Sequence, residues 1–469
     1  MSQSQCIRVP LHPDHAESFI DFARSLAERP DELAAILAEE GMRAEAVFLD
    51  RTAEDVAVVI FTRAHDLQAA HAATSWILTW DDHEFTNNPW MDGAQNHNPE
   101  DGEGDWETRK AAALRAFFEW MPIREPEPGR AREAIWRTFS FGDLATLVML
   151  ETRLTGRDEQ LDYGRDLGWL ETGFKADAEG RMQALEPDQL IPTPPPDTEI
   201  RRTPFDVTGP EPRPILDYDR VVAIDADAPP PGVAFLRDVD AFRARLDDPD
   251  RRMIDPAQET WLVDTVREAE DAGVCWQLVG NQIIVARMPL FDFASYYDAG
   301  TIARLSESGY VAGQIERGRY GLPANLDAWD GYPAQRDRIV DALSATGAHP
   351  LFVTGDTHVF WANEIEDSTG ARCAAEFGTT AVTSPGFGDD YDGLDPPMTE
   401  VMAGGYPGTR FVSSENRGYL LMTLGRDEAT CEMIATSAPD EAETRSEIAA
   451  RWVQRRRGPD GRLPPLERA

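Results

Sequence analysis

Leu351-Phe-Val-Thr-Gly355-Asp356-Thr357-His358 is the stretch that decides the fold, because a short apolar run leads directly into polar side chains. Two other stretches have the same design: Trp76-Ile-Leu-Thr-Trp80-Asp81-Asp82-His83-Glu84 and Trp276-Gln-Leu-Val-Gly280-Asn281-Gln282. Short apolar runs that end in turn residues are typical of buried strands. In layered α/β proteins, ligand sites form at the carboxyl ends of strands. The three stretches therefore predict an α/β protein with a polar site at its strand ends.

The polar residues in these stretches are of the types that bind metal ions. Carboxylates and amide carbonyls are ligands for hard divalent cations, and imidazole suits borderline ones. A histidine outside the metal shell can protonate a leaving oxygen. Each motif alone has an ordinary alternative: Gly280-Asn281-Gln282 can be a β-turn, and Gly355-Asp356 can be a helix N-cap or a turn. The other six histidines, His349 among them, lack this context and are expected to be surface or structural residues.

Charge and cysteine content restrict the class of function. The 469-residue chain has a net charge of −39, and Lys110 and Lys175 are its only lysines. Such a chain should be repelled by nucleic acid and by anionic membranes. Its four cysteines are far apart and form no Cys-x-x-Cys pair, so we expect buried thiols rather than disulfides or a zinc site. Neither a signal peptide nor a membrane span is expected, which predicts a cytoplasmic protein.

Residues 1–75 are predicted to be a separate small α+β domain. Cys6–Val9 has the pattern of a strand, and Arg43–Asp50 with Val56–Thr62 has that of a hairpin. Helical periodicity covers Pro13–Arg29, Asp31–Glu40 and Ala64–Ala73. The order resembles ferredoxin-like domains of the dimeric α+β-barrel type. That resemblance implies a homodimer formed through residues 1–75.

The rest of the chain divides into a large domain, residues 76–436, and a charged tail, residues 437–469. We expect strands at Ile77–Trp80, Arg137–Glu151, Cys275–Val279 and Pro350–Thr354, and helices at Trp106–Trp120, Pro256–Ala272, Ala334–Thr346 and, in the tail, Asp440–Arg456. Residues 87–105 and 155–215 are expected to be loops, since both are rich in turn residues.

A series of motifs between Trp76 and Thr436 resembles, in order, those of the PhoD-like alkaline phosphatases. The matching segments are Trp80-Asp81-Asp82-His83-Glu84 with Asn87-Asn88, Trp261-Leu262, Gly280-Asn281-Gln282, Trp329-Asp330-Gly331-Tyr332-Pro333, Gly355-Asp356-Thr357-His358 with Trp361-Ala362-Asn363, and Glu376-Phe377-Gly378-Thr379-Thr380 with Thr383-Ser384. Each motif alone is weak, whereas the ordered series is specific. The family is similar to calcineurin-like metallophosphoesterases.

The resemblance implies an α/β fold, a four-layer α/β/β/α sandwich, and hydrolysis of small phosphate mono- or diesters by metal-activated water. Calcium and iron are the implied metals, and the implied residues fall into three groups. Metal ligands are Asp81, Asp82, Asn281, Asp356 and His358; catalytic residues are His83, Asp82 and His358; substrate contacts are Asn87 and Asn88. Arg287, which belongs to none of the quoted motifs, is also predicted to contact phosphate, with a surface charge as the alternative. Arg153 is a further candidate for phosphate contact.

Two motifs of this family are not found upstream of Trp76: a Gly-Ser-Cys-like strand end and a Gly-Asp-x-x-Tyr element. By the same resemblance they supply the cysteine, the bridging aspartate and the tyrosine that hold iron. A phosphatase domain truncated at its start is therefore expected, with residues 1–75 in place of that part. The alternative function is a catalytically inactive, phosphatase-like fusion that binds phosphate or another ligand, or that mediates dimerisation.

Overall fold

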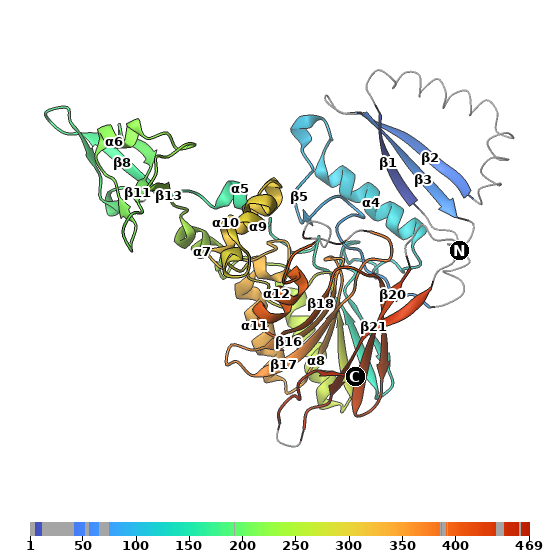
Figure 1. Ribbon diagram of the computed structural model, residues 1–469. Helices are drawn as coiled ribbons and strands as arrows, with labels where there is room; N and C mark the ends of the chain where they lie inside the picture. Colours follow the sequence, from blue (N-terminus) through green and yellow to red (C-terminus); the bar gives the residue numbers. More distant parts are fainter. Residues whose placement is uncertain are drawn as a thin grey trace, which may run out of the picture. The chain divides into compact units, whose positions relative to one another are not determined.

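The computed structural model describes residues 5–11, 42–51, 56–64, 75–191, 193–384, 386, 391, 393–437, 445–458 and 461–469 (Figure 1). The chain forms two compact units. The first comprises Met1–Asn87 and Gln95–Glu133, and the second comprises Asn88–Ala94 and Ala134–Ala469. The predicted mixed α/β class is confirmed, because several sheets and helices make up the described residues.

In the first unit, β1 (Gln5–Leu11), β2 (Met42–Arg51) and β3 (Val56–Ala64) form an antiparallel sheet in the order β1-β3-β2. The predicted strand at Cys6–Val9 and the predicted hairpin are thereby confirmed. The three helices predicted in this region lie outside the described residues, apart from Ala64 at the end of β3. The ferredoxin-like arrangement and the homodimer therefore stay predictions.

The helix predicted at Trp106–Trp120 is confirmed as α4, with the same bounds. Asp105 caps it by accepting the backbone N–H of Thr108 at 2.9 Å. The strand predicted at Ile77–Trp80 was wrong, since residues 75–80 belong to no strand. Trp80 is fully buried by edge-on aromatic contacts instead, with ring centroids 5.3 Å from Phe117 and 5.5 Å from Phe85. Packing on α4 thus replaces the hydrogen-bonded ladder of a sheet.

A seven-stranded mixed sheet organises the second unit. Its strands, in spatial order, are β18 (Thr409–Ser413), β16 (Phe360–Glu366), β17 (Arg372–Gly378), β15 (Leu351–Thr354), β14 (Trp276–Gly280), β7 (Ala145–Met149) and β6 (Arg137–Phe141). The four central strands, β17, β15, β14 and β7, are parallel. The strands predicted at Cys275–Val279 and Pro350–Thr354 are confirmed, and Arg137–Glu151 forms a hairpin of two strands, β6 and β7.

A second, antiparallel sheet of four strands lies against this one. Its order is β19 (Arg417–Leu424), β20 (Glu428–Thr436), β21 (Ser446–Arg455) and β22 (Glu467–Arg468). The helix predicted over Asp440–Arg456 was wrong, because β21 occupies most of it. Ala450, Trp452 and Gln454 are buried at every second position, so the period is that of a strand.

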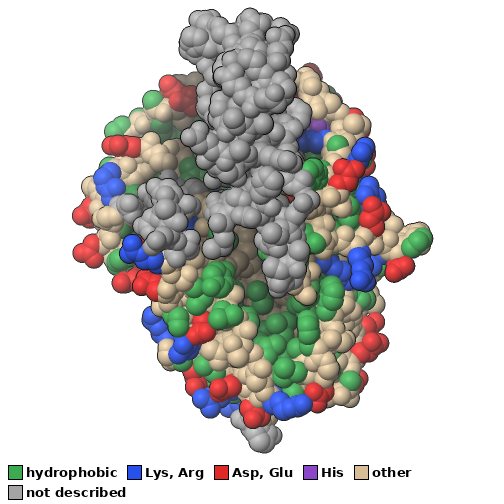
Figure 2. All heavy atoms as spheres, turned by 90° about the vertical axis from the view of Figure 1, so that its right-hand side faces the viewer, with side chains coloured by type: hydrophobic (Ala, Val, Ile, Leu, Met, Phe, Trp, Pro, Cys, Tyr) green, Lys and Arg blue, Asp and Glu red, His purple; other side chains and the backbone are tan. Residues whose placement is uncertain are grey.

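The two sheets share a core that contains Trp276, Phe360 and Phe377 of the larger sheet and Met433 and Trp452 of the smaller one. Burial of this interface is incomplete along β19. Leu420, Met422 and Leu424 are only partly buried there, and Tyr419 and Leu421 each expose 46% of their surface. Figure 2 looks onto the side where β20 and β21 lie in Figure 1, and hydrophobic side chains gather on its described surface.

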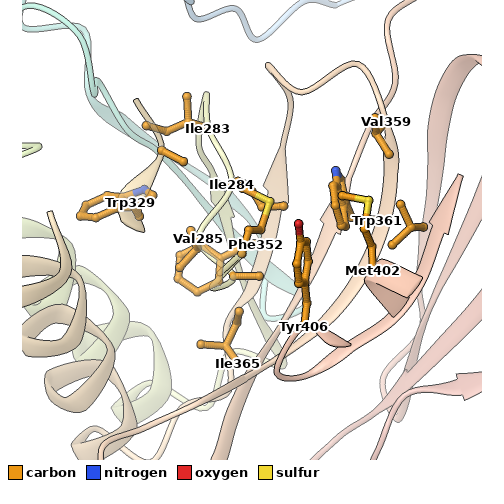
Figure 3. Close-up of a cluster of buried hydrophobic side chains, with 14 of the residues drawn as sticks. Ile283, Ile284, Val285, Trp329, Phe352, Val359, Trp361, Ile365, Met402 and Tyr406 are labelled. Carbon is orange, nitrogen blue, oxygen red and sulfur yellow. The ribbon is translucent and has the colours of Figure 1, made fainter. Parts of the chain in front are cut away.

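Helices cover the opposite face of the larger sheet. They are α8 (Pro256–Asp271), α11 (Pro333–Ala345) and α12 (Met398–Gly405). The core on this side includes Ile284, Phe352, Trp361 and Tyr406 (Figure 3). The helices predicted at Pro256–Ala272 and Ala334–Thr346 are thus confirmed to within one residue at each end. A second helical layer, which a four-layer sandwich needs, stays a prediction.

Residues 155–215, predicted to be a loop, contain short elements. β8 (Glu171–Ala176), β9 (Met182–Ala184) and β10 (Glu199–Arg202) form one small sheet, and β11 (Pro204–Asp206), β12 (Arg213–Pro214) and β13 (Val233–Phe235) form another. Phe174, Ile215 and Val221 make a separate small core. Pattern reading missed these strands because most are only two to four residues long.

The remaining elements are short. They are α5 (Tyr163–Asp166), α6 (Tyr218–Ala223), α7 (Val239–Leu246), α9 (Ala299–Leu305), α10 (Gly309–Gly318), the pair β4 (Pro89–Trp90) and β5 (Gly93–Ala94), and 3-10 turns at Pro99–Asp101, Pro187–Gln189, Phe293–Ser295 and Trp329–Gly331. Among the described helices, none has both the length and the apolar character needed to cross a bilayer.

His349 lies just before the amino end of β15, whereas the polar residues Asp356 and His358 follow its carboxyl end. Its side chain is buried against Trp276, with ring centroids 5.6 Å apart, and neither ring nitrogen has a described hydrogen-bond partner. Burial, together with the charges of Arg457 and Arg456, lowers the pKa of His349 to about 4. The ring is therefore neutral in the folded protein at neutral pH.

His349 should make the protein sensitive to acid. The folded-state pKa of His349 is about 4, and an unfolded histidine has a pKa of about 6.5. Between these two pH values, only the unfolded chain is protonated at His349. Stability is present above that window and is lost as pH falls through it, by about 3 kcal/mol at most. Replacing His349→Gln should flatten the dependence of the unfolding free energy on pH over this range, measured by urea denaturation. Identical slopes for both proteins would contradict the assignment.

Candidate functional site

Three neighbouring parallel strands of the second unit end at one edge of the sheet. Backbone hydrogen bonds continue past the strands and tie the three ends together. Leu150 N donates to Gly280 O at 2.8 Å, Asn281 N to Val353 O at 3.0 Å, and Gly355 N to Gln282 O at 3.0 Å. The segments after β7, β14 and β15 are therefore fixed side by side. The sequence-predicted residues Asn281, Asp356 and His358 all lie in these segments.

Asn281 follows β14 directly and is 4% exposed. Its amide nitrogen donates to Ile283 O at 2.6 Å, which orients the side chain. The carbonyl oxygen Oδ1 is buried and has no hydrogen-bond partner among the described residues. An unsatisfied buried acceptor costs about 1–3 kcal/mol, so native proteins seldom retain one without a use. A cation bound at Oδ1 would satisfy it.

Asp356 and His358 lie in a tight turn after β15. Both have left-handed backbone conformations, with φ of 66° and 55°. Such angles are uncommon for residues other than glycine and are found preferentially at functional sites. Trp361 Nε1 donates to Thr357 Oγ1 at 2.9 Å, and Thr380 Oγ1 donates to His358 O at 2.8 Å. Contacts with β16 and with the segment after β17 thus hold the turn in its strained form.

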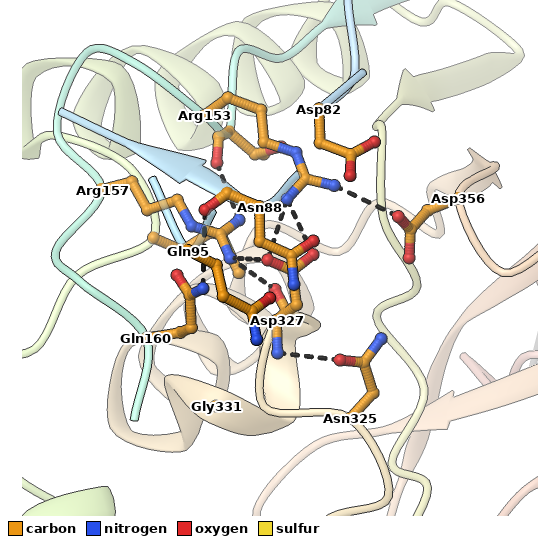
Figure 4. Close-up of polar contacts among 12 residues, drawn as sticks. Asp82, Asn88, Gln95, Arg153, Arg157, Gln160, Asn325, Asp327, Gly331 and Asp356 are labelled. Atoms are coloured by element: carbon orange, nitrogen blue, oxygen red, sulfur yellow. Dashed lines mark hydrogen bonds and ion pairs between the residues drawn. The ribbon is translucent and has the colours of Figure 1, made fainter. Parts of the chain in front are cut away.

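Arg153 lies in the segment after β7 and is linked to the other strand-end residues by ion pairs. Its side chain is completely buried, and Nη1 donates to both carboxylate oxygens of Asp327 at 2.9 and 2.7 Å. The other terminal nitrogen, Nη2, donates to Asp356 Oδ1 at 3.2 Å (Figure 4). Arg157 also pairs with Asp327. Burial would raise the pKa of Asp327, but the two guanidiniums hold it below its ordinary value.

A second buried carboxylate fixes the segment that follows Asn281. Glu376 on β17 has no exposed surface and accepts the backbone N–H groups of Val285 and Ala286 at 2.6 and 3.0 Å. Asn363 Nδ2 donates to it as well, at 2.9 Å. Burial raises the pKa of Glu376, although these three donors oppose the shift. The carboxylate therefore anchors the backbone just after the predicted metal ligand.

The remaining predicted ligands and acids lie in the first unit, in the turn after Trp80. Asp82 is 6% exposed, and its carbonyl accepts Phe85 N at 2.9 Å and Thr86 N at 3.0 Å. The backbone N–H of Asp81 donates to Glu84 Oε2 at 3.0 Å. His83 Nε2 lies 3.5 Å from Asp82 Oδ2, and the His83 side chain is 76% exposed. An exposed imidazole beside a buried carboxylate can hold and release a proton.

The predicted substrate contacts have described partners of their own. Asn87 Nδ2 donates to Gln95 Oε1 at 2.8 Å within the first unit. In the second unit, the backbone carbonyl of Asn88 accepts Gln160 Nε2 at 3.5 Å, and Arg287 Nη2 pairs with Asp337 at 2.5 Å. Arg287 also borders a cavity of about 220 Å³ lined by prolines and by Asp330, not by the strand-end residues. The substrate-binding role of all three stays a prediction.

Sequence reasoning missed Asp327 and Glu376 as parts of the site. Glu376 belongs to one of the motifs in the family series, so it could have been found there. Asp327 lies only two residues before the Trp329-Asp330-Gly331 motif. Lone acidic residues are common, and their pairing with Arg153 over 174 positions of sequence is visible only in three dimensions.

Comparison with known families gives two matches. The model of the PhoD-like phosphatase family matches residues 60–433, about four fifths of the chain. A second model, a family of unknown function (DUF6176), matches residues 2–100. Residues 60–100 are covered by both models. The segment before Trp76, which lacks the two phosphatase motifs, thus largely matches a different family.

Two relatives extend the comparison. Alkaline phosphatase D of Bacillus subtilis (strain 168) is 26% identical over 333 residues, which are 69% of this chain and 39% of that protein. A solved structure described as the structure of PhoD matches with a TM-score of 0.52 at 20% identity, over 86% of this chain and 56% of that one. The chain thus spans only about two fifths to a little over half of these relatives, and the structural match concerns the fold.

Glu376 should prove essential to the stability of this region. A glutamine would present an amide N–H₂ group to backbone N–H donors that now meet carboxylate oxygens. Glu376→Gln is therefore expected to lower the free energy of unfolding by about 2–4 kcal/mol, measured by urea denaturation. Glu366→Gln, at the exposed end of β16, is the matched control and should change it by less than about 0.5 kcal/mol. Equal effects of the two substitutions would show that the buried anchor is unimportant.

Proposed function

The chain belongs to the PhoD-like phosphatase family, and we propose that it is a metal-dependent phosphoesterase that hydrolyses small phosphate mono- or diesters. One observation carries the proposal more than any other. A buried amide oxygen that has no hydrogen-bond partner among the described residues, Asn281 Oδ1, lies on the strand end next to the turn that holds Asp356 and His358. That arrangement has the ligand types and the rigidity that a cation site needs.

The donor set fits a divalent metal. Carboxylate, amide carbonyl and imidazole are offered by Asp356, Asn281 and His358, and such ligands suit calcium, manganese or iron. The ligand set that we propose adds Asp81 and Asp82, on the strength of the Trp-Asp-Asp-His-Glu motif in the family series. A metal held by these residues would supply a Lewis acid and lower the pKa of a bound water.

The protein's own groups would handle the substrate and its protons. His83, exposed and beside Asp82, is the proposed general acid that protonates the leaving oxygen, while Asp82 limits the orientation of the imidazole. His358 is the second histidine of the proposed catalytic set. The buried Arg153 and Glu376 hold the strand-end segments still, so that little reorganisation is needed during reaction.

The charge of the molecule favours small substrates over polyanions. A net charge of −39 opposes the approach of nucleic acid, whose affinity for proteins depends on cationic contacts to phosphate. A small phosphate ester needs neutralisation only at the metal site. We therefore propose a small ester as substrate. The alternative, an inactive phosphatase-like protein that binds phosphate, would keep the same pocket residues without turnover.

Hydrolysis of bis-p-nitrophenyl phosphate and p-nitrophenyl phosphate tests the proposal. We expect the metal-free protein to be inactive and to gain activity with calcium, manganese or iron. Asp356→Asn and Asn281→Ala should each reduce turnover about 100-fold or more, because a ligand that fixes the metal is lost. Asp264→Asn on the exposed face of α8 is the control and should leave turnover unchanged.

Two outcomes would count against the enzyme. Tight metal binding without turnover of either ester would favour the inactive phosphate-binding alternative. Turnover that survives in Asp356→Asn at the rate of the unaltered protein would show that another site performs the reaction.

A further inference from the structure

Arg153 connects two acidic residues at the carboxyl edge of the sheet. Its two terminal nitrogens serve different carboxylates: Nη1 binds Asp327, and Nη2 donates to Asp356 Oδ1 at 3.2 Å. Resting on the proposed function, we propose that Arg153 is a positioning residue. By holding Oδ1 of Asp356, it turns the other oxygen of that carboxylate toward the metal.

The position of Arg153 is itself fixed from the backbone. Its N–H donates to Glu151 Oε1 at 2.8 Å, and Glu151 has no exposed surface. The same carboxylate accepts the N–H groups of Leu154 and Thr155, each at 2.9 Å. The side chain of Gln258 on α8 forms two hydrogen bonds with the backbone of Glu151. Its Oε1 accepts Glu151 N, and its Nε2 donates to Glu151 O, each at 2.8 Å. The segment after β7 is thus rigid where Arg153 begins.

The far end of the guanidinium is fixed by Asp327. Asp327 is 4% exposed and lies between Arg153 and Arg157, both completely buried. Its own backbone N–H donates to Asn325 Oδ1 at 2.9 Å. Because Asp327 occupies Nη1 completely, Nη2 can reach only a limited set of positions. A planar, rigid fork is what allows one side chain to hold two carboxylates at once.

A guanidinium in this place has two consequences for a metal ligand. Asp356 has a backbone φ of 66° and lies in a turn, and the hydrogen bond from Arg153 Nη2 restricts the orientation of its carboxylate. With Oδ1 engaged, the carboxylate would offer a single oxygen to the cation. Groups that orient metal ligands in this way typically change metal affinity by about 10- to 100-fold when they are replaced.

Arg157 provides a matched control within the same cluster. It is as buried as Arg153, pairs with the same Asp327, and also donates to Thr152 O at 3.2 Å. No described hydrogen bond or ion pair joins it to Asp356. Replacement of either arginine by lysine keeps the charge and removes the fork. Only the change at Arg153 should disturb Asp356.

The test is titration of the full-length, metal-free protein with Mn²⁺ alone. Binding is measured by calorimetry and by the electron paramagnetic resonance signal of bound Mn²⁺. We expect Arg153→Lys to weaken Mn²⁺ binding about 10-fold or more and to alter the resonance signal. Arg157→Lys should keep the affinity within about threefold and leave the signal unchanged, even if both variants lose similar thermal stability. Circular dichroism establishes that each variant is folded.

The possible results separate this inference from the proposed function. If the unaltered protein binds Mn²⁺ and hydrolyses esters, yet Arg153→Lys binds Mn²⁺ as tightly, Arg153 has no positioning role. An equal loss of Mn²⁺ affinity in both variants would mean that the arginine is structural and would overturn the inference. Failure of Arg153→Lys alone to fold would have the same meaning. Absence of Mn²⁺ binding in the unaltered protein would instead refute the metal-dependent function.

Discussion

Buried charges at the carboxyl edge of the larger sheet are the constraint on which the rest of the candidate site depends. Arg153 and Asp327 pair with almost no contact with water, and Glu376 is completely enclosed. Removing ions from water is costly, so such groups persist only where every partner is in place. Each of these charges binds a segment that follows a strand. The site is therefore rigid, because breaking any one of these buried interactions would leave a polar group buried without its partner.

The sequence predicted the parts of this edge that are local. The strands before Asn281 and Asp356 are mostly apolar and largely buried, as expected of parallel strands covered on both faces. Their polar ends could be assigned without a structure, since each motif follows its strand directly. The pairing of Arg153 with Asp327 and Asp356 could not, because it joins residues 174 and 203 positions apart.

Two errors of prediction have physical causes. Ile77–Trp80 reads as a strand because it is apolar, but Trp80 is buried by aromatic rings on α4 rather than by a ladder. Asp440–Arg456 was predicted to be a helix in a charged tail, yet pairing with β20 makes Ser446–Arg455 a strand. In both, tertiary contacts override local preference. The match of residues 2–100 to a different family agrees with the observation that two phosphatase motifs are not found before Trp76.

We propose that the strand ends of the second unit hold a cation through Asn281 Oδ1 and Asp356. A crystal structure of the protein soaked with Mn²⁺, with data collected at the manganese absorption edge, tests it most directly. We expect an anomalous peak about 2.0–2.5 Å from Asn281 Oδ1 and from one oxygen of Asp356. A peak elsewhere, with Asn281 Oδ1 still bound to nothing or to protein alone, would contradict it.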